Sequence, residues 1–334
     1  MSKAGTIKWL CKALVAGVAA LLVLNLFCAL YYNVPFRIPA PDGITDYAWS
    51  QGAFSSRLTE GFGYGFIDKN GYNNAEVLAE VDDPDVLVMG SSHMEAFNVP
   101  QDKSTAYVLD GLLREYGLNA YSIGISGHDF FAASKNLPAA LRAKKPRYVV
   151  IETGSVDFPA QAFEDYINGD REPVRENRGA LEQLTRVPYF RLLYTQWQNL
   201  HENNNNEQAG GAGGILPSAE LLQKYMDSVS NAAAGSGAKI IIFYHPQLLI
   251  DGGGGVAVAG DVKAVSDFSA ACANAGIAFV DLTETFVEAY RRNHVLPHGF
   301  FNTEIGTGHL NEYGHRMAAE ELAETIIAIE GGAQ

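Results

Sequence analysis

Short apolar runs alternate with amphipathic segments from about residue 85 to the C-terminus. The apolar runs predict five buried strands, at residues 86–89, 119–123, 148–152, 239–244 and 278–281. Apolar residues with the helical period predict helices at 106–116, 131–142, 221–234, 262–275 and 312–329. Strands that alternate with helices of this length form a parallel sheet covered on both faces. The pattern therefore predicts an α/β protein with a three-layer α/β/α, flavodoxin-like sandwich.

The N-terminal residues follow a different pattern. Lys3, Lys8 and Lys12 precede an uncharged, mostly apolar run at residues 13–30. This run approaches the roughly 20 residues that a helix needs to cross a bilayer. Basic residues on the short N-terminal side favour keeping that side in the cytoplasm. We predict that residues 1–32 form a cytoplasmic tip and an uncleaved transmembrane helix, with the rest of the chain extracytoplasmic. A cleaved signal peptide is the alternative.

The remaining chain divides by composition. Residues 33–80 are rich in glycine, proline and aromatic residues, and we expect them to link the membrane helix to the main domain and to wrap its outside. The main domain is expected at residues 81–331. Within it, residues 158–217 contain no expected strand and are predicted to be an insertion. The aromatic part of this insertion, at 187–197, is either a lid beside the site or a helix packed on the domain.

Composition and charge exclude some classes of function. The chain has 334 residues, of which 47% are hydrophobic, so it has enough apolar side chains for a large core. Its formal net charge of -14 argues against nucleic acid as a partner, because phosphate-binding surfaces need an excess of Lys and Arg. The three cysteines do not make a disulfide framework, and no Cys/His cluster has zinc spacing. We therefore predict neither a metal nor a cofactor.

Small hydroxyl residues directly follow the first predicted strand, in Gly90-Ser91-Ser92. Ligands of parallel sheets bind at the carboxyl ends of the strands, so a side chain here is well placed for chemistry. A serine hydroxyl is a weak nucleophile and needs a positioned base. His309, at the start of the last predicted helix, is the best candidate, because nucleophile and base need to meet only in the fold. The alternative role for Ser92 is to cap the next short helix.

Three further candidates follow the other strands of the predicted sheet. Gly127 comes after the second strand, Asp157 after the third and His245 after the fourth. We expect Asp157 and His245 to line the cleft. Asn302 is a fourth candidate, because its amide could orient the imidazole of His309 without a charge.

Four sequence blocks resemble those of the SGNH (GDSL-like) hydrolase superfamily. They are Gly90-Ser91-Ser92, Ser126-Gly127, Gly154-Ser155-Val156-Asp157 and Gly306-Thr307-Gly308-His309. The resemblance covers roughly residues 80 to 330, and its first and last blocks are the most specific. The chain departs from the superfamily at three positions: Ser91 and Gly306 stand where the superfamily has Asp, and Val156 stands where it has Asn.

The resemblance implies a role for each of these residues. Ser92 would be the nucleophile and His309 its base, while the backbone N–H groups of Ser92 and Gly127 would form the oxyanion hole. Because Gly306 has no carboxylate, the acid of the triad must come from elsewhere. Glu304 is the first candidate, if the glycine-rich loop folds back onto His309. A backbone carbonyl of the same loop is the alternative partner.

Together these features predict an extracytoplasmic serine esterase that acts through an acyl-serine intermediate. Its substrate is expected to be an acylated carbohydrate, with O-acetyl groups of an envelope glycan as the first choice. Two other functions remain open. The protein could be an O-acyltransferase that modifies an exopolysaccharide or cell-wall glycan. It could also be a non-catalytic binding or assembly protein on a degraded SGNH scaffold, which the departures at Val156 and Gly306 favour.

Overall fold

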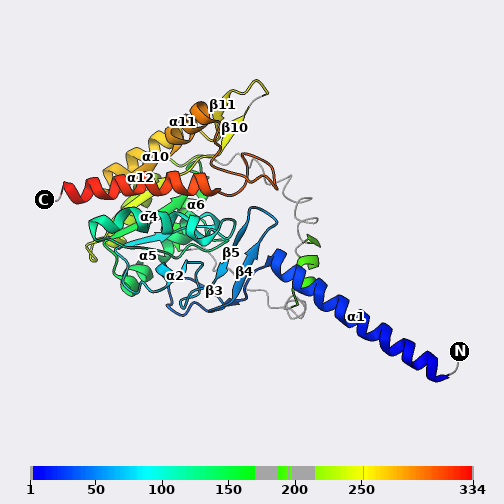
Figure 1. The fold of residues 1–334 in the computed structure, drawn as a ribbon. Coiled ribbons are helices and arrows are strands. Elements are labelled where there is room, and N and C mark those ends of the chain that lie inside the picture. Colours follow the sequence, from blue (N-terminus) through cyan, green and yellow to red (C-terminus); the bar gives the residue numbers. More distant parts are fainter. Residues whose placement is uncertain (1–2, 170–186, 195, 198–214, 251, 333–334) are drawn as a thin grey trace. The chain divides into compact units, whose positions relative to one another are not determined.

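The computed structural model of the protein describes residues 3–169, 187–194, 196–197, 215–250 and 252–332 (Figure 1). The chain forms two compact units. The first comprises Met1–Val34 and Arg175–Ala212, and the second comprises Pro35–Val174 and Gly213–Gln334.

The first unit is built around α1 (Lys3–Tyr31), followed by the short β1 (Tyr32–Asn33). Most side chains of α1 are apolar and exposed, and the helix is long and apolar enough to cross a membrane, although a signal sequence would have the same character. Part of the predicted insertion belongs to this unit: the backbone N–H of Tyr189 donates to Asn25 Oδ1 at 3.3 Å. The Asn- and Gly-rich part of the insertion, at 203–214, lies outside the described residues.

The second unit contains the predicted parallel sheet, in the order β12-β9-β8-β6-β7. Its strands are β6 (Val86–Met89), β7 (Ala120–Ser122), β8 (Tyr148–Thr153), β9 (Lys239–Tyr244) and β12 (Ala278–Asp281). The first strand, β6, pairs with β7 on one side and with β8 on the other, so the chain reverses its direction across the sheet at β6. This reversal creates a crevice at the carboxyl ends of the strands. The predicted flavodoxin-like fold class is confirmed.

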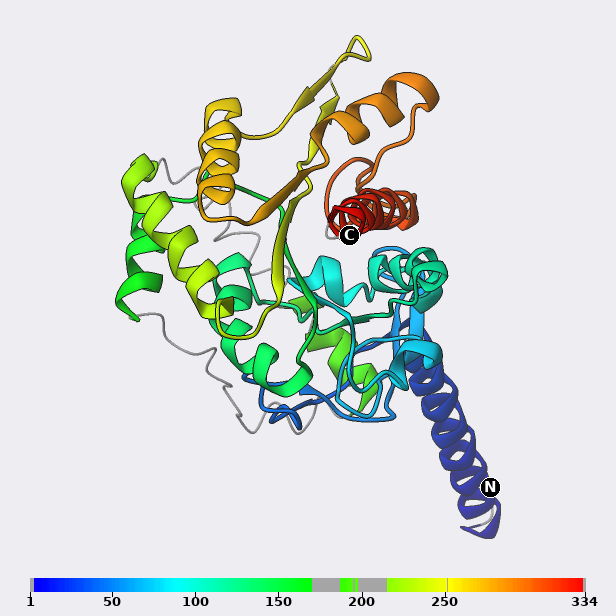
Figure 2. The ribbon, with the colours of Figure 1, turned by 90° about the vertical axis from the view of Figure 1, so that its left-hand side faces the viewer.

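Helices cover both faces of the sheet (Figure 2). All five predicted helices are present: α4 (Thr105–Leu113), α5 (Phe130–Lys144), α9 (Ala219–Ala233), α10 (Val262–Asn274) and α12 (Glu312–Gly331). α4 and α12 pack together on one face, while α5, α9 and α10 cover the other. Short helical turns complete the chain at α2 (Glu76–Ala79), α3 (Ser92–Glu95), η1 (Gln101–Lys103) and η2 (Arg114–Tyr116).

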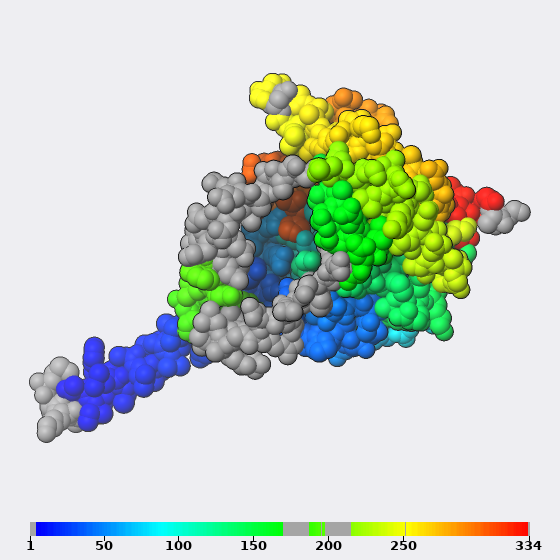
Figure 3. All heavy atoms as spheres, turned by 180° about the vertical axis from the view of Figure 1, so that it is seen from behind, coloured from blue at the N-terminus to red at the C-terminus, as the bar shows by residue number. Residues whose placement is uncertain are grey.

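Some elements of this unit are additional to those expected. α6 (Ala160–Asn168) occupies the start of the predicted insertion, and Figure 3 shows it, in green, against α9, in yellow-green. α11 (Thr283–Asn293) follows β12. β10 (Leu248–Ile250) and β11 (Val256–Val258) form an antiparallel hairpin on either side of a glycine-rich turn.

The segment before the sheet is an integral part of the second unit. β2 (Arg37–Ile38) pairs with β3 (Ala48–Trp49), and β4 (Phe54–Arg57) pairs with β5 (Gly63–Phe66). The rings of Tyr47, Trp49 and Tyr72 are buried, which accounts for the aromatic-rich composition of this stretch. The loop between β4 and β5 carries a residue that is important for the site.

One buried histidine of the core links stability to pH. His315 on α12 is 1% exposed, and its Nδ1 lies 2.9 Å from Thr105 Oγ1 on α4. Burial, together with the nearby His245 and His309, lowers the pKa of His315 to about 3. In the unfolded chain the pKa of a histidine is about 6.5. Below pH 6.5 the unfolded state therefore binds a proton that the folded state does not bind.

This difference predicts that the free energy of unfolding falls as the pH drops below 6.5 towards 3. The contribution of His315 should approach ~1.4 kcal/mol per pH unit. Urea unfolding between pH 7 and pH 4.5 should show a shallower pH dependence for His315→Gln than for the wild type. Equal slopes for the two proteins would refute this assignment.

Candidate active site

The turn after β6 leaves the hydroxyl of Ser92 available for chemistry. Ser91, and not Ser92, is the N-cap of α3, because Ser91 Oγ accepts the backbone N–H of His93 at 3.3 Å. Gly90 is required at the strand end, since a Cβ there would lie 2.5 Å from Glu152 Oε2. Because Gly90 has no side chain, Glu152 can come close enough to accept the backbone N–H of Ser91 at 2.7 Å, which anchors the turn to β8.

The structure brings Ser92 and His309 together across 217 positions of the chain. Nε2 of His309 lies 2.9 Å from Ser92 Oγ, within hydrogen-bond distance. His309 is held in place at the entrance to α12, where Asn311 caps the helix by accepting the N–H groups of Tyr313 at 3.0 Å and Gly314 at 3.1 Å. The candidate nucleophile and base therefore have the geometry that proton transfer requires.

The acidic partner of His309 differs from the one expected: it is Glu60, and not Glu304. Glu60 lies in the loop between β4 and β5, and its Oε2 is 2.8 Å from Nδ1 of His309. Its other oxygen accepts the backbone N–H of His309 at 2.9 Å. Gly308 makes room for this carboxylate, because a Cβ at that position would lie 2.6 Å from Glu60 Oε1.

Glu304 is exposed, and the loop it belongs to closes through its backbone. The carbonyl oxygen of Glu304 accepts the N–H of Thr307 at 3.4 Å and its hydroxyl at 3.3 Å. These two bonds use the backbone of Glu304, and its side-chain carboxylate takes no part in them. In the described part of the chain, the carboxylate of Glu304 makes no hydrogen bond to His309.

Asn302 acts on the loop that carries Glu60 and not on the imidazole. Its Oδ1 accepts the N–H of Gly61 at 2.9 Å, and its Nδ2 donates to the carbonyl of Leu58 at 3.0 Å. These bonds hold both sides of the Glu60 position. The expectation that Asn302 orients the ring of His309 directly is therefore wrong. Asn302 holds the loop of Glu60, and Glu60 contacts the ring.

The electrostatics of the Glu60–His309 pair favour a single tautomer of the ring. Burial by itself would raise the pKa of Glu60, but the hydrogen bonds and charge of His309 outweigh it and hold this pKa below its usual value. Glu60 is therefore ionised at neutral pH and accepts the hydrogen on Nδ1 of His309. Nε2 is then unprotonated and faces the hydroxyl of Ser92 as a base.

The Ser126-Gly127 turn is tied to the helix that carries Ser92. The hydroxyl of Ser126 bonds to the carboxylate of Glu95 on α3, and its carbonyl accepts the hydroxyl of Tyr47. Gly127 has a φ of +86°, a conformation that favours glycine, and it is exposed. The turn thus presents a backbone N–H at the carboxyl edge of the sheet, after β7.

The two residues expected to line the cleft, Asp157 and His245, lie in different environments. Asp157 is exposed and accepts the hydroxyl of Ser155, while the neighbouring Val156 packs into the core with 4% of its surface exposed. His245, in contrast, is 1% exposed at the end of β9, and its Nε2 lies 2.7 Å from Glu152 Oε1. Within the described residues, neither Asp157 nor His245 forms a hydrogen bond with His309 or Ser92.

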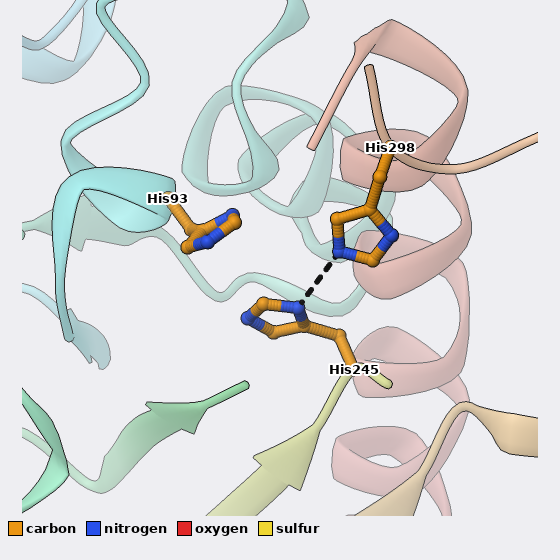
Figure 4. Close-up of side chains that lie close together, drawn as sticks. All are labelled: His93, His245 and His298. Atoms are coloured by element: carbon orange, nitrogen blue, oxygen red, sulfur yellow. Dashed lines mark hydrogen bonds between the residues drawn. The ribbon is translucent and has the colours of Figure 1, made fainter. Parts of the chain in front are cut away.

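His245 belongs to a cluster of three rings that the sequence spacing does not reveal (Figure 4). One ring nitrogen from each of His93, His245 and His298 lies within 4.8 Å of the others. His93 lies in α3, His245 follows β9 and His298 lies in the loop after α11, so the three rings come together only in three dimensions. By distance alone, this is the group that could hold a metal ion within the described residues.

The hydrogen bonds of the cluster fit a proton network better than a metal site. Nδ1 of His93 accepts the N–H of Leu310 at 3.2 Å, so the hydrogen of the neutral ring is on Nε2, which then has no lone pair for a metal. His245 donates to Glu152, and its Nδ1 lies 3.2 Å from Nε2 of His298. Burial, then the nearby His245, lowers the pKa of His93 well below its usual value and that of His298 to about 2. These two rings are therefore neutral. The network holds the Ser91 turn through Glu152, and it holds Leu310, the residue after His309, through His93.

No protein-family model matches the sequence, and no curated protein matches it either. Solved structures similar to this chain include esterases. The psychrotrophic esterase EstA from Pseudoalteromonas sp. is 12% identical over 75% of this chain and 100% of the esterase, with a TM-score of 0.41. The acetyl xylan esterase AlAXEase is 12% identical over 72% of this chain and 99% of its own, with a TM-score of 0.42.

A member of the lipolytic G-D-S-L family from Veillonella parvula is 15% identical to this chain. The match covers 72% of this chain and 96% of that protein, with a TM-score of 0.38. The G-D-S-L name of this protein is also the name of the superfamily that the sequence blocks resemble.

Proposed function

We propose that the protein is a serine esterase that works through an acyl-enzyme on Ser92. The proposal depends on one observation, the continuous chain of hydrogen bonds from Ser92 Oγ to His309 Nε2 at 2.9 Å and from His309 Nδ1 to Glu60 Oε2 at 2.8 Å. Nucleophile, base and acid are thereby arranged in the order that activates a serine hydroxyl. The presence of Glu60 removes the main reason for a non-catalytic scaffold, which was the missing acid at Gly306.

In the first half of the reaction, His309 takes the proton of Ser92 as Oγ attacks the carbonyl carbon of the ester. Glu60 stays ionised and stabilises the imidazolium that forms. The tetrahedral intermediate collapses when its C–O bond to the alcohol breaks and His309 returns the proton to the leaving oxygen. In the second half, His309 takes a proton from a water molecule as the water oxygen attacks acyl-Ser92. The bond between Oγ and the acyl carbon then breaks, His309 returns the proton to Oγ, and the carboxylic acid leaves the free serine.

We assign the oxyanion hole to the backbone N–H groups of Ser92 and Gly127. Ser92 is the first residue of α3, so its N–H has no partner within the helix. Val156 has no side-chain amide to act as a third donor. A missing donor costs on the order of 3 kcal/mol of transition-state stabilisation, so a hole with two donors would support slower turnover.

The proposed substrate is an O-acyl group, with O-acetyl as the first choice, on a glycan of the cell envelope. Two features support it: α1, which as a membrane helix with a basic N-terminal end would hold the second unit outside the cytoplasm, and the resemblance of the sequence blocks to a superfamily with members that acetylate exopolysaccharides. The second candidate is O-acyl transfer, in which a sugar hydroxyl replaces water in the second half-reaction.

The full-length protein in detergent is expected to hydrolyse p-nitrophenyl acetate and to release acetate from acetylated xylo-oligosaccharides. Acetate release and product masses should be measured with and without an unacetylated oligosaccharide as acceptor. Free acetate as the main product in both cases supports the esterase. Acetylated acceptor at the expense of free acetate would assign the protein as a transferase, and turnover of neither substrate would contradict both.

A further inference from the structure

An unusual alternation of residues follows directly after the candidate acid. The sequence Gly61-Phe62-Gly63-Tyr64-Gly65-Phe66 places three aromatic residues at every second position. In an extended strand, alternate residues share one face. Phe62, Tyr64 and Phe66 are indeed 44%, 61% and 63% exposed, whereas the intervening glycines are buried.

The glycines fix the direction of the aromatic side chains. A Cβ at Gly63 would lie 1.7 Å from the carbonyl oxygen of Phe97, and one at Gly61 would lie 2.0 Å from that of Asn98. A Cβ at Gly65 would meet the side chain of Gln101 at 2.2 Å. The strand therefore lies flat against the segment that follows α3. A register slip by one residue would drive aromatic rings into this backbone, so the exposed row is enforced by the fold.

The aromatic row is continuous with the candidate active site. Phe62 is two residues from Glu60, and its ring stacks on that of Phe301, with centroids 4.8 Å apart and an interplanar angle of 17°. Phe301 is 76% exposed and lies in the loop that leads to His309. Tyr64 and Phe66 extend the row along β5, with ~7 Å between alternate side chains.

Such a row needs a contact partner, because contiguous exposed aromatic rings on a soluble surface usually mark a binding site. The negative faces of aromatic rings attract the weakly positive C–H groups on the flat side of a sugar ring. An anionic membrane surface fits less well, because the flanking loops carry Glu60 and Glu304, and membrane-docking surfaces use Lys and Arg. The nearby cation of Arg57 on β4 is already engaged, because its guanidinium lies over the buried ring of Phe97, 5.4 Å from the ring centre.

We propose that Phe62, Tyr64, Phe66 and Phe301 form an aromatic platform that binds an extended glycan chain. Sugar rings stack along the platform and lead the ester-bearing sugar to Ser92. This inference rests on the proposed function and deepens it, because it assigns an oligosaccharide chain, and not a small ester, as the preferred substrate. The platform acts in binding, so it contributes to KM more than to turnover.

The test compares substrates of different length in the double variant Tyr64→Ala/Phe66→Ala, which leaves Phe62 beside Glu60 intact. For the wild type, KM should fall from acetylated xylobiose to acetylated xylohexaose. The double variant should lose this dependence, with a roughly tenfold higher KM for the hexaose and an unchanged kcat. Its rate with p-nitrophenyl acetate should equal that of the wild type, which also reports that the variant is folded.

The control variant is Tyr116→Ala, which removes an exposed tyrosine on η2 and should leave all parameters unchanged. A hexaose KM that is the same in the double variant and the wild type would overturn the platform. So would a wild type that cleaves p-nitrophenyl acetate with no preference for longer chains, although the esterase proposal would then stand. If the wild type cleaves neither ester, retarded migration in a gel that contains unacetylated xylan, lost in the double variant, still supports the platform. Unretarded migration of the wild type overturns it.

Discussion

Ser92→Ala is expected to lower kcat/KM for p-nitrophenyl acetate by roughly 10³-fold or more, because no other atom can form the acyl-enzyme. The hydroxyl of Ser92 is half-buried and bonds to His309, so its removal leaves the packing of α3 intact. The thermal midpoint of unfolding should therefore stay close to that of the wild type. Steady-state kinetics and circular dichroism melts of the same preparation measure both quantities.

Ser91→Ala is the matched control. It removes the N-cap of α3 and should cost about 1 kcal/mol of stability, while esterase activity is retained. An inactive Ser91→Ala together with an active Ser92→Ala would show that the nucleophile has been assigned to the wrong residue of the pair.

Glu60→Gln is expected to reduce turnover by roughly 10² to 10⁴-fold, with little change in KM. The glutamine is similar in size and shape, but it lacks the charge that stabilises the imidazolium. Its amide can also donate to Nδ1 of His309, which would place the ring hydrogen on Nε2 and prevent His309 from accepting the serine proton. The measurement is the kcat of the purified variant with p-nitrophenyl acetate at pH 7.

Glu304→Gln is the control for this prediction, because Glu304 is the acid that the sequence favours. The exposed Glu304 should tolerate the change with no loss of kcat. Full activity of Glu60→Gln combined with an inactive Glu304→Gln would restore the original assignment and remove Glu60 from the mechanism.

The central strands of the sheet could be predicted closely because β6, β8 and β9 are short, mostly apolar runs that are buried on both faces. β6, β9 and β12 have the predicted bounds, and the core helices begin and end within a turn of theirs. α6 and α11 are not evident in the sequence, because each helix buries a single side chain, Phe163 in α6 and Phe286 in α11. The β10–β11 hairpin surrounds a glycine run that has no strand pattern of its own.

Two of the three residues of the candidate triad could be predicted from the sequence, and the third could not. Ser92 and His309 stand in sequence blocks with a local pattern, at a strand end and a helix start. Glu60 lies 249 positions from His309 in a segment with no such pattern, so its approach depends entirely on the fold. The one indirect sign is Gly308, whose missing side chain makes room for the Glu60 carboxylate and not for a folded-back Glu304. The ring cluster of His93, His245 and His298 was hidden for the same reason.

The most direct test of the acyl-serine mechanism is mass spectrometry of the protein after reaction with a fluorophosphonate. The probe forms a stable phosphonyl ester with a serine whose proton is removed by a neighbouring base. We predict a single adduct on the peptide that contains Ser92, and a strongly slowed reaction in Glu60→Gln. The absence of an adduct, or an adduct on another serine, would contradict the mechanism proposed for this site.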